Sequence, residues 1–112
     1  MSKPKYNDTT QDLYGLTGKF KTKPGKGGEM VAILLQAAEG VKAAKGCHLY
    51  VVCQDATNPD TIWVFETWDS KEDHDNSLKL PGTPEMIAKA MPLIDGKPEG
   101  TPLVVAGGLG LF

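Results

Sequence analysis

Two side chains capable of acid–base chemistry lie eight residues apart near the middle of the sequence. Glu66 is a carboxylate in the mostly apolar run 61–68, where it would act as a base of raised pKa or as a hydrogen-bonding partner at an interface. His74 lies in the polar segment that follows, and an imidazole titrates near neutral pH. We therefore expect Glu66 and His74 to be candidate catalytic bases. The alternative for His74 is a partly exposed histidine on a helix.

Four further side chains are candidates for binding a small molecule beside these two. Trp68 shares a strand face with Glu66, and its indole N–H could hydrogen-bond a substrate oxygen; alternatively it is a core aromatic that anchors helix to sheet. Tyr50 would line either the pocket or a subunit interface, and the interface is the safer expectation. Asn76 and Ser77 are secondary hydrogen-bonding candidates in the helix that carries His74.

The composition argues against several other kinds of site. The two histidines are far apart in the sequence and the two cysteines lack CxxC spacing, so we expect no metal site. The net charge is −2 and all 12 cationic side chains are lysines, which gives no electrostatic footprint for nucleic acid. No apolar run approaches the roughly 20 residues that a membrane span requires, so no membrane partner is expected.

The cysteines also bear on the cellular compartment. Cys47 and Cys53 are six residues apart, which in a regular strand puts them on one face about 20 Å apart, too far for a disulfide. Reduced thiols, together with a polar N-terminus that has no secretory signal, predict a cytoplasmic location.

Hydrophobic periodicity predicts the elements that must position these groups. We expect a flexible segment over residues 1–11 and one domain over 12–112. The expected strands cover residues 12–21, 47–56, 61–68 and 102–111. The expected helices are one over 29–44 that Gly46 ends, one capped by Asp69 that runs to about Leu80, and one capped by Thr83 that ends near Pro92.

The βαββαβ order of these elements predicts an α+β fold of the ferredoxin-like type. Its four-stranded antiparallel sheet would carry helices on one face only. Apolar and aromatic residues occupy both faces of the strands 47–56 and 61–68, and one helix layer cannot cover both. We therefore expect a partner sheet on the other face, and hence a homodimer.

Several short motifs, in this order and spacing, resemble one family. They are Lys23-Pro24-Gly25, Gly46-Cys47, the run from Phe65 to Glu72, His74, Ser77-Leu78 and Pro92-Leu93-Ile94. Over about residues 12–110 the chain is similar to the antibiotic biosynthesis monooxygenase (ABM) superfamily. The resemblance implies a dimeric α/β barrel with a cavity in each subunit between sheet and helices. Many members carry a histidine three positions after His74, where this chain has Ser77.

The resemblance also implies a function. It implies a quinol monooxygenase-like enzyme that oxidises a quinol or a related aromatic or polycyclic phenol with O2, without metal, flavin or other cofactor. Such chemistry requires a base, hydrogen bonds to a phenolate and a dry pocket. We expect that pocket between the sheet and the second helical segment, with Trp68 on its wall and His74 or Glu66 near its polar end. Two alternatives are a non-catalytic dimeric protein that binds a small molecule or serves as an accessory subunit, and a haem-degrading monooxygenase.

Overall fold

The computed structural model describes residues 13–110, so the segment expected to be flexible, 1–11, lies outside the described residues. The elements are β1 (Tyr14–Lys21), α2 (Gly27–Val41), β2 (Cys47–Gln54), β3 (Thr61–Trp68), α3 (Lys71–Ser77), α4 (Thr83–Ala90), the 3-10 turn η1 (Met91–Leu93) and β4 (Glu99–Val104). Within these residues no helix is both long and apolar enough to cross a bilayer.

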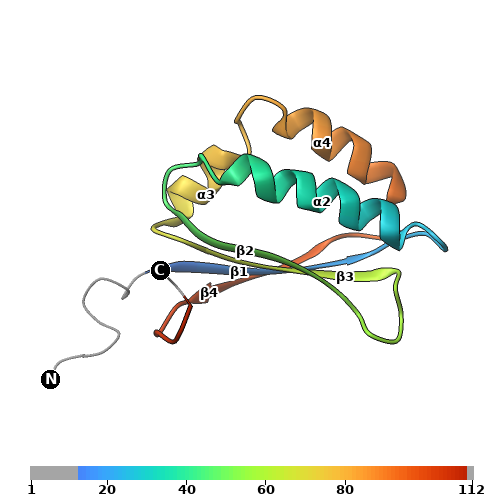
Figure 1. Ribbon diagram of the computed structural model, residues 1–112, viewed down its shortest axis with the longest axis horizontal. Coiled ribbons are helices and arrows are strands. Elements are labelled where there is room, and N and C mark those ends of the chain that lie inside the picture. The colour runs from blue at the N-terminus through green and yellow to red at the C-terminus, as the bar shows by residue number, and fades with distance from the viewer. Residues whose placement is uncertain (1–12, 111–112) are drawn as a thin grey trace, which may run out of the picture.

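The four strands form one antiparallel sheet in the order β2-β3-β1-β4. All three helices lie on the same side of this sheet, with α2 lengthwise above it and α4 beside α2 (Figure 1). The expected ferredoxin-like α+β fold with helices on one face is thereby confirmed.

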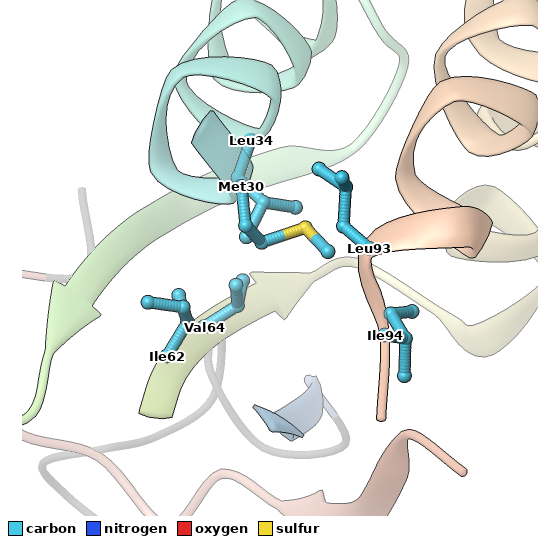
Figure 2. Packing of buried hydrophobic residues seen from close by; sticks show 6 residues of the cluster. All are labelled: Met30, Leu34, Ile62, Val64, Leu93 and Ile94. Atoms are coloured by element: carbon cyan, nitrogen blue, oxygen red, sulfur yellow. The ribbon is translucent and has the colours of Figure 1, made fainter. Parts of the chain in front are cut away.

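The core fixes α2 above β3. Met30 and Leu34, one helical turn apart, point toward Ile62 and Val64, which lie two residues apart on one face of β3 (Figure 2). Leu93 and Ile94 close the cluster from the chain that follows α4. This cluster holds one end of the helix layer on the sheet.

The start of α2 is held by a residue from the β2–β3 hairpin. Oδ1 of Asp60 accepts the N–H of Gly27 at 2.9 Å, and Oδ2 accepts the N–H of Gly25 at 3.0 Å. These hydrogen bonds hold the pKa of Asp60 below its usual range. Asp60 thus satisfies the N–H of Gly27, one of the groups that a helix start leaves without partners, and α2 begins two residues before the expected position.

Three other helix boundaries also differ from the expectation. Helix α2 ends at Val41, and Gly46 instead makes the left-handed turn (φ 85°) that leads into β2. Ser70, not Asp69, caps α3, because the hydroxyl of Ser70 accepts the N–H of Asp73 at 3.1 Å. Helix α4 follows Gly82, and Thr83 makes no capping hydrogen bond.

A bulge in β2 changes the expected faces of the two cysteines. Cys47 pairs with Trp68 and Leu49 pairs with Thr67, so His48 is an extra residue in the ladder. Because directly opposed residues share a face, Cys47 lies on the helix side with Trp68, whereas Cys53 lies on the helix-free side. The prediction that both cysteines share one face was wrong.

Strand β4 is shorter and earlier than predicted. It spans Glu99–Val104 in place of 102–111 and pairs with β1 from Lys19 back to Tyr14. Val104 pairs with Tyr14, the first residue of β1, and one further hydrogen bond, from the N–H of Val105 to the backbone oxygen of Leu13 at 3.1 Å, follows it.

Candidate active site

An apolar cavity of about 330 Å³ lies between the sheet, α2 and α4. Its walls are mostly aliphatic, sulfur-containing and aromatic side chains, among them Leu16, Phe20, Met30, Leu34, Met86 and Ile87. Tyr50, Glu66 and His74 also line it. A smaller space of about 80 Å³ shares these three side chains. The three groups therefore form the polar end of an otherwise apolar chamber, at the place where the sequence predicted a pocket.

Glu66 is positioned by the middle of the sheet. It lies on β3 between Leu16 of β1 and Tyr50 of β2, on the helix side. Its side chain is 12 % exposed. Burial raises the pKa of Glu66, while the hydrogen bond from Trp68 and the proximity of His74 oppose that rise. A carboxyl in this environment holds a proton more readily than an exposed one, which favours a role in proton transfer.

His74 reaches the same point from α3. Its Nε2 lies 3.8 Å from Oε1 of Glu66, and its side chain is also 12 % exposed. The imidazole packs edge-on against Trp68, with ring centres 5.7 Å apart, and at a tilt against Tyr14. The distance between Nε2 and Oε1 exceeds a hydrogen bond, so a substrate hydroxyl could contact both groups.

Tyr50 lies on the cavity wall opposite Glu66 in the β2–β3 ladder. Its pKa is raised, first by burial and then by the nearby charge of Glu66. The phenol therefore stays protonated and remains a hydrogen-bond donor at neutral pH. Of the two environments considered for Tyr50, the structure places it at the pocket.

Trp68 lies behind the cavity. It is completely buried, and its indole Nε1–H donates to Oε1 of Glu66 at 2.9 Å. Trp68 is not among the side chains that line the cavity. The structure thus gives its N–H a protein partner where the sequence suggested a substrate oxygen, and Trp68 combines the core role with support of Glu66.

The two secondary candidates lie in different surroundings. Ser77 is buried, lines the smaller space, and donates its hydroxyl to the backbone oxygen of His74. Asn76 is exposed and borders a separate surface depression with Asp73 and Leu80. The structure therefore brings Ser77, but not Asn76, to the group formed by Tyr50, Glu66 and His74.

Sequence reasoning missed Asp75, which lies next to His74. Oδ1 of Asp75 is 2.9 Å from Nδ1 of His74, and Oδ2 is 2.7 Å from Nζ of Lys71. The available signals were the adjacency of a carboxylate to a candidate base and the four-residue spacing from Lys71.

Metal-binding side chains do not cluster in the part of the chain that the structure describes. Among residues 13–110 no group of three or more histidine, cysteine, aspartate or glutamate side chains could hold a metal ion. Cys47 and Cys53 are both free thiols.

A sequence profile and a solved structure both relate the chain to the same family. The sequence profile described as Antibiotic biosynthesis monooxygenase matches residues 13–89. A solved structure from Chloroflexus aurantiacus, described as a proposed antibiotic biosynthesis monooxygenase, is 43% identical, with a TM-score of 0.79 over 89% of this chain and 99% of that one.

Two further matches are more distant. A variant of SnoaB, a cofactor-independent oxygenase from Streptomyces nogalater, is 13% identical with a TM-score of 0.75 over 88% of this chain and 97% of that chain, which shows the shared fold alone. An uncharacterised protein from Synechocystis is 27% identical over 79 residues, which is 70% of this chain and 54% of the relative. The chain therefore spans about half the length of this curated relative.

Proposed function

Because the chain belongs to the antibiotic biosynthesis monooxygenase family, we propose that it is a cofactor-independent monooxygenase that oxidises a quinol or a related aromatic or polycyclic phenol with O2. The observation that carries this proposal is the apolar cavity whose polar end is formed by Glu66 and His74, 3.8 Å apart. The walls suit a flat aromatic ring, and the polar end suits its hydroxyl group.

The proposed reaction needs no electron donor other than the substrate. A phenol with a free ring position reacts with O2 to give a quinone and water. One oxygen atom forms a bond to ring carbon, the other leaves as water, and the phenol supplies all four electrons. The protein must make the phenol electron-rich by removing its hydroxyl proton.

The residues at the polar end of the cavity would act as the proton acceptor and as the hydrogen-bond donor. Either the carboxylate of Glu66 or Nε2 of His74 accepts the hydroxyl proton, because Oε1 of Glu66 and Nε2 of His74 border the same 3.8 Å gap. Tyr50, protonated at neutral pH, donates a hydrogen bond to the phenolate. The apolar walls shield part of the bound ring from water, the fixed polar groups stabilise the anion, and O2 has an apolar space beside it.

We further propose that the protein works as a homodimer in the cytoplasm. On the helix-free side of the sheet, Val51, Phe65 and Leu103 are 39%, 40% and 49% exposed. Large apolar side chains exposed on one sheet face are typical of an interface. The free thiols of Cys47 and Cys53 support a reducing compartment.

The test is oxygen consumption by the purified protein with a set of hydroquinones and naphthols, with ¹⁸O₂ to trace one labelled atom into the quinone. We expect His74→Ala to lower turnover by about 10²–10⁴-fold with the fold retained. Ligand binding without oxygen uptake would support the non-catalytic alternative, and a sharp Soret band on haem titration would support the haem-degrading one.

Two adjacent alanines of α2 provide a matched pair for the cavity itself. Ala37 lines the cavity, whereas Ala38 borders a different surface groove. Leucine at position 37 fills part of the chamber, so Ala37→Leu should weaken substrate binding by about tenfold, roughly 1.4 kcal/mol. Ala38→Leu should leave binding unchanged. Equal effects of the two variants would place the substrate elsewhere.

A further inference from the structure

We propose that Asp75 is a positioning residue for His74: its carboxylate accepts the Nδ1–H of His74 and thereby fixes the imidazole tautomer whose unprotonated Nε2 faces Glu66 and the cavity. The catalytic meaning of this arrangement rests on the proposed monooxygenase function. The arrangement itself does not, because the tautomer of His74 can be measured without any substrate.

Both oxygens of the Asp75 carboxylate are engaged. Oδ1 lies 2.9 Å from Nδ1 of His74, and Oδ2 lies 2.7 Å from Nζ of Lys71, one helical turn earlier on α3. These two hydrogen bonds hold the pKa of Asp75 below its usual range, and the one with Lys71 has the larger effect. An ionised carboxylate can only accept a hydrogen bond, so Nδ1 of His74 must be the donor.

A neutral imidazole carries one N–H, so donation from Nδ1 leaves Nε2 with a free lone pair. The ring cannot readily turn to exchange its two nitrogens, because Trp68 and Tyr14 pack against it at centre distances of 5.7 Å. Nε2 is therefore directed to the gap in front of Glu66, which is where a proton acceptor is needed.

Apart from Glu66, the side chains that share the smaller space with His74 carry no charge that would compete with Asp75 for the imidazole. The side chains that α2 and α4 contribute there are uncharged, namely Ala37, Val41, Thr83 and Met86. Burial raises the pKa of Tyr50 of β2, so this phenol is neutral near neutral pH. Glu66 on one side and Asp75 on the other thus flank the imidazole, at Nε2 and Nδ1 respectively.

The chain contains a matched control for this pair. Its other histidine, His48, has Nε2 2.6 Å from Oδ1 of Asp69, an exposed carboxylate on the same end of the sheet. Asp75→Asn should therefore change His74 alone, and Asp69→Asn should change His48 alone. Asparagine has a single acceptor oxygen, which Lys71 Nζ requires because an ammonium can only donate; the amide NH2 then faces Nδ1 of His74, so Asp75→Asn favours the opposite tautomer.

The experiment is ¹⁵N NMR of the imidazole nitrogens in the full chain, with signals assigned by their loss in His74→Ala. We expect neutral His74 in the unsubstituted protein to carry its proton on Nδ1, and Asp75→Asn to shift population to Nε2–H, with no such change in Asp69→Asn. A predominant Nε2–H tautomer in the unsubstituted protein, or an unchanged tautomer in Asp75→Asn, would overturn the proposal.

Turnover then separates this inference from the proposed function. With an oxidised phenol in hand, Asp75→Asn should lower kcat by about ten- to a hundredfold and leave KM unchanged, because Asp75 is half exposed and does not line the cavity. A shifted tautomer in a protein that oxidises no phenol would support the positioning role of Asp75 and overturn only the monooxygenase proposal.

Discussion

The indole N–H of Trp68 donates a 2.9 Å hydrogen bond to Oε1 of Glu66, and the same oxygen lies 3.8 Å from Nε2 of His74. One carboxylate oxygen is therefore approached from the core by a fixed donor and from the cavity side by a titratable ring. This geometry gives Glu66 a defined position and couples its protonation to that of the neighbouring base.

Trp68→Phe should raise the pKa of Glu66 further, because the lost hydrogen bond is one that favours the ionised carboxylate. The variant should also lose about 2 kcal/mol in the free energy of unfolding, since Trp68 is completely buried and phenylalanine is smaller and has no N–H. Carboxyl ¹³C NMR titration and urea unfolding measure the two effects.

Trp63→Phe is the matched control for Trp68→Phe. Trp63 lies on the helix-free side of β3 and contacts Lys19, 5.1 Å from the ring centre. Its substitution should leave the titration of Glu66 unchanged. A normal Glu66 titration in Trp68→Phe would mean that the indole hydrogen bond does not tune this carboxyl.

Glu66→Gln should increase stability at neutral pH. Burial raises the pKa of Glu66 above the 4.5 of an unburied glutamate, so the folded state binds this proton more tightly than the unfolded state. The unfolding free energy contributed by Glu66 is therefore fully present below pH 4.5 and falls as the pH rises through the folded-state pKa. Glutamine cannot ionise and still offers an oxygen to Trp68.

Chemical denaturation of both proteins at pH values on either side of 4.5 measures this effect. The stability advantage of Glu66→Gln should be near zero on the acid side and should grow toward neutral pH. An advantage that is largest in acid, or a variant that is less stable at neutral pH, would show that the charged form of Glu66 is favoured by the fold.

Gly27→Ala and Gly28→Ala should have opposite effects on stability: the first should lower the free energy of unfolding and the second should raise it. A Cβ at Gly27 would clash with the backbone oxygen of Pro59, so the hairpin must move and we expect the free energy of unfolding to fall by about 2 kcal/mol. A Cβ at Gly28 meets nothing within 4 Å, and alanine favours the helix by about 0.5–1 kcal/mol. Thermal unfolding of both variants checks the packing of the 55–60 loop on α2; a stable Gly27→Ala protein would contradict it.

Phe65→Lys should dissociate the proposed dimer. Phe65 is 40% exposed at the centre of the helix-free sheet face, and a lysine there would place a charge in an interface that we expect to bury more than about 1,000 Å² in total. Leu35→Lys changes a side chain of α2 that is 51% exposed and should leave assembly intact. Sedimentation analysis separates the two, and a monomeric unsubstituted protein at all concentrations would refute the dimer.

The local pattern of the sequence predicted those features that depend on neighbours along the chain. The alternation of Ile62, Val64, Glu66 and Trp68 placed one face of β3 correctly, because side chains alternate along a strand whatever it pairs with. The same alternation put Glu66 and Trp68 side by side, and the βαββαβ order gave the fold.

Only the tertiary structure decided the features that depend on distant partners. The bulge at His48 arises in the pairing of β2 with β3 and moves Cys47 to the other face. The indole N–H of Trp68 has its partner in Glu66, and the helix start at Gly27 has its partner in Asp60, 33 residues away. Periodicity specifies which way a side chain points, but register and hydrogen-bond partners are set when separate elements pack, and those partners determine the chemistry of each group.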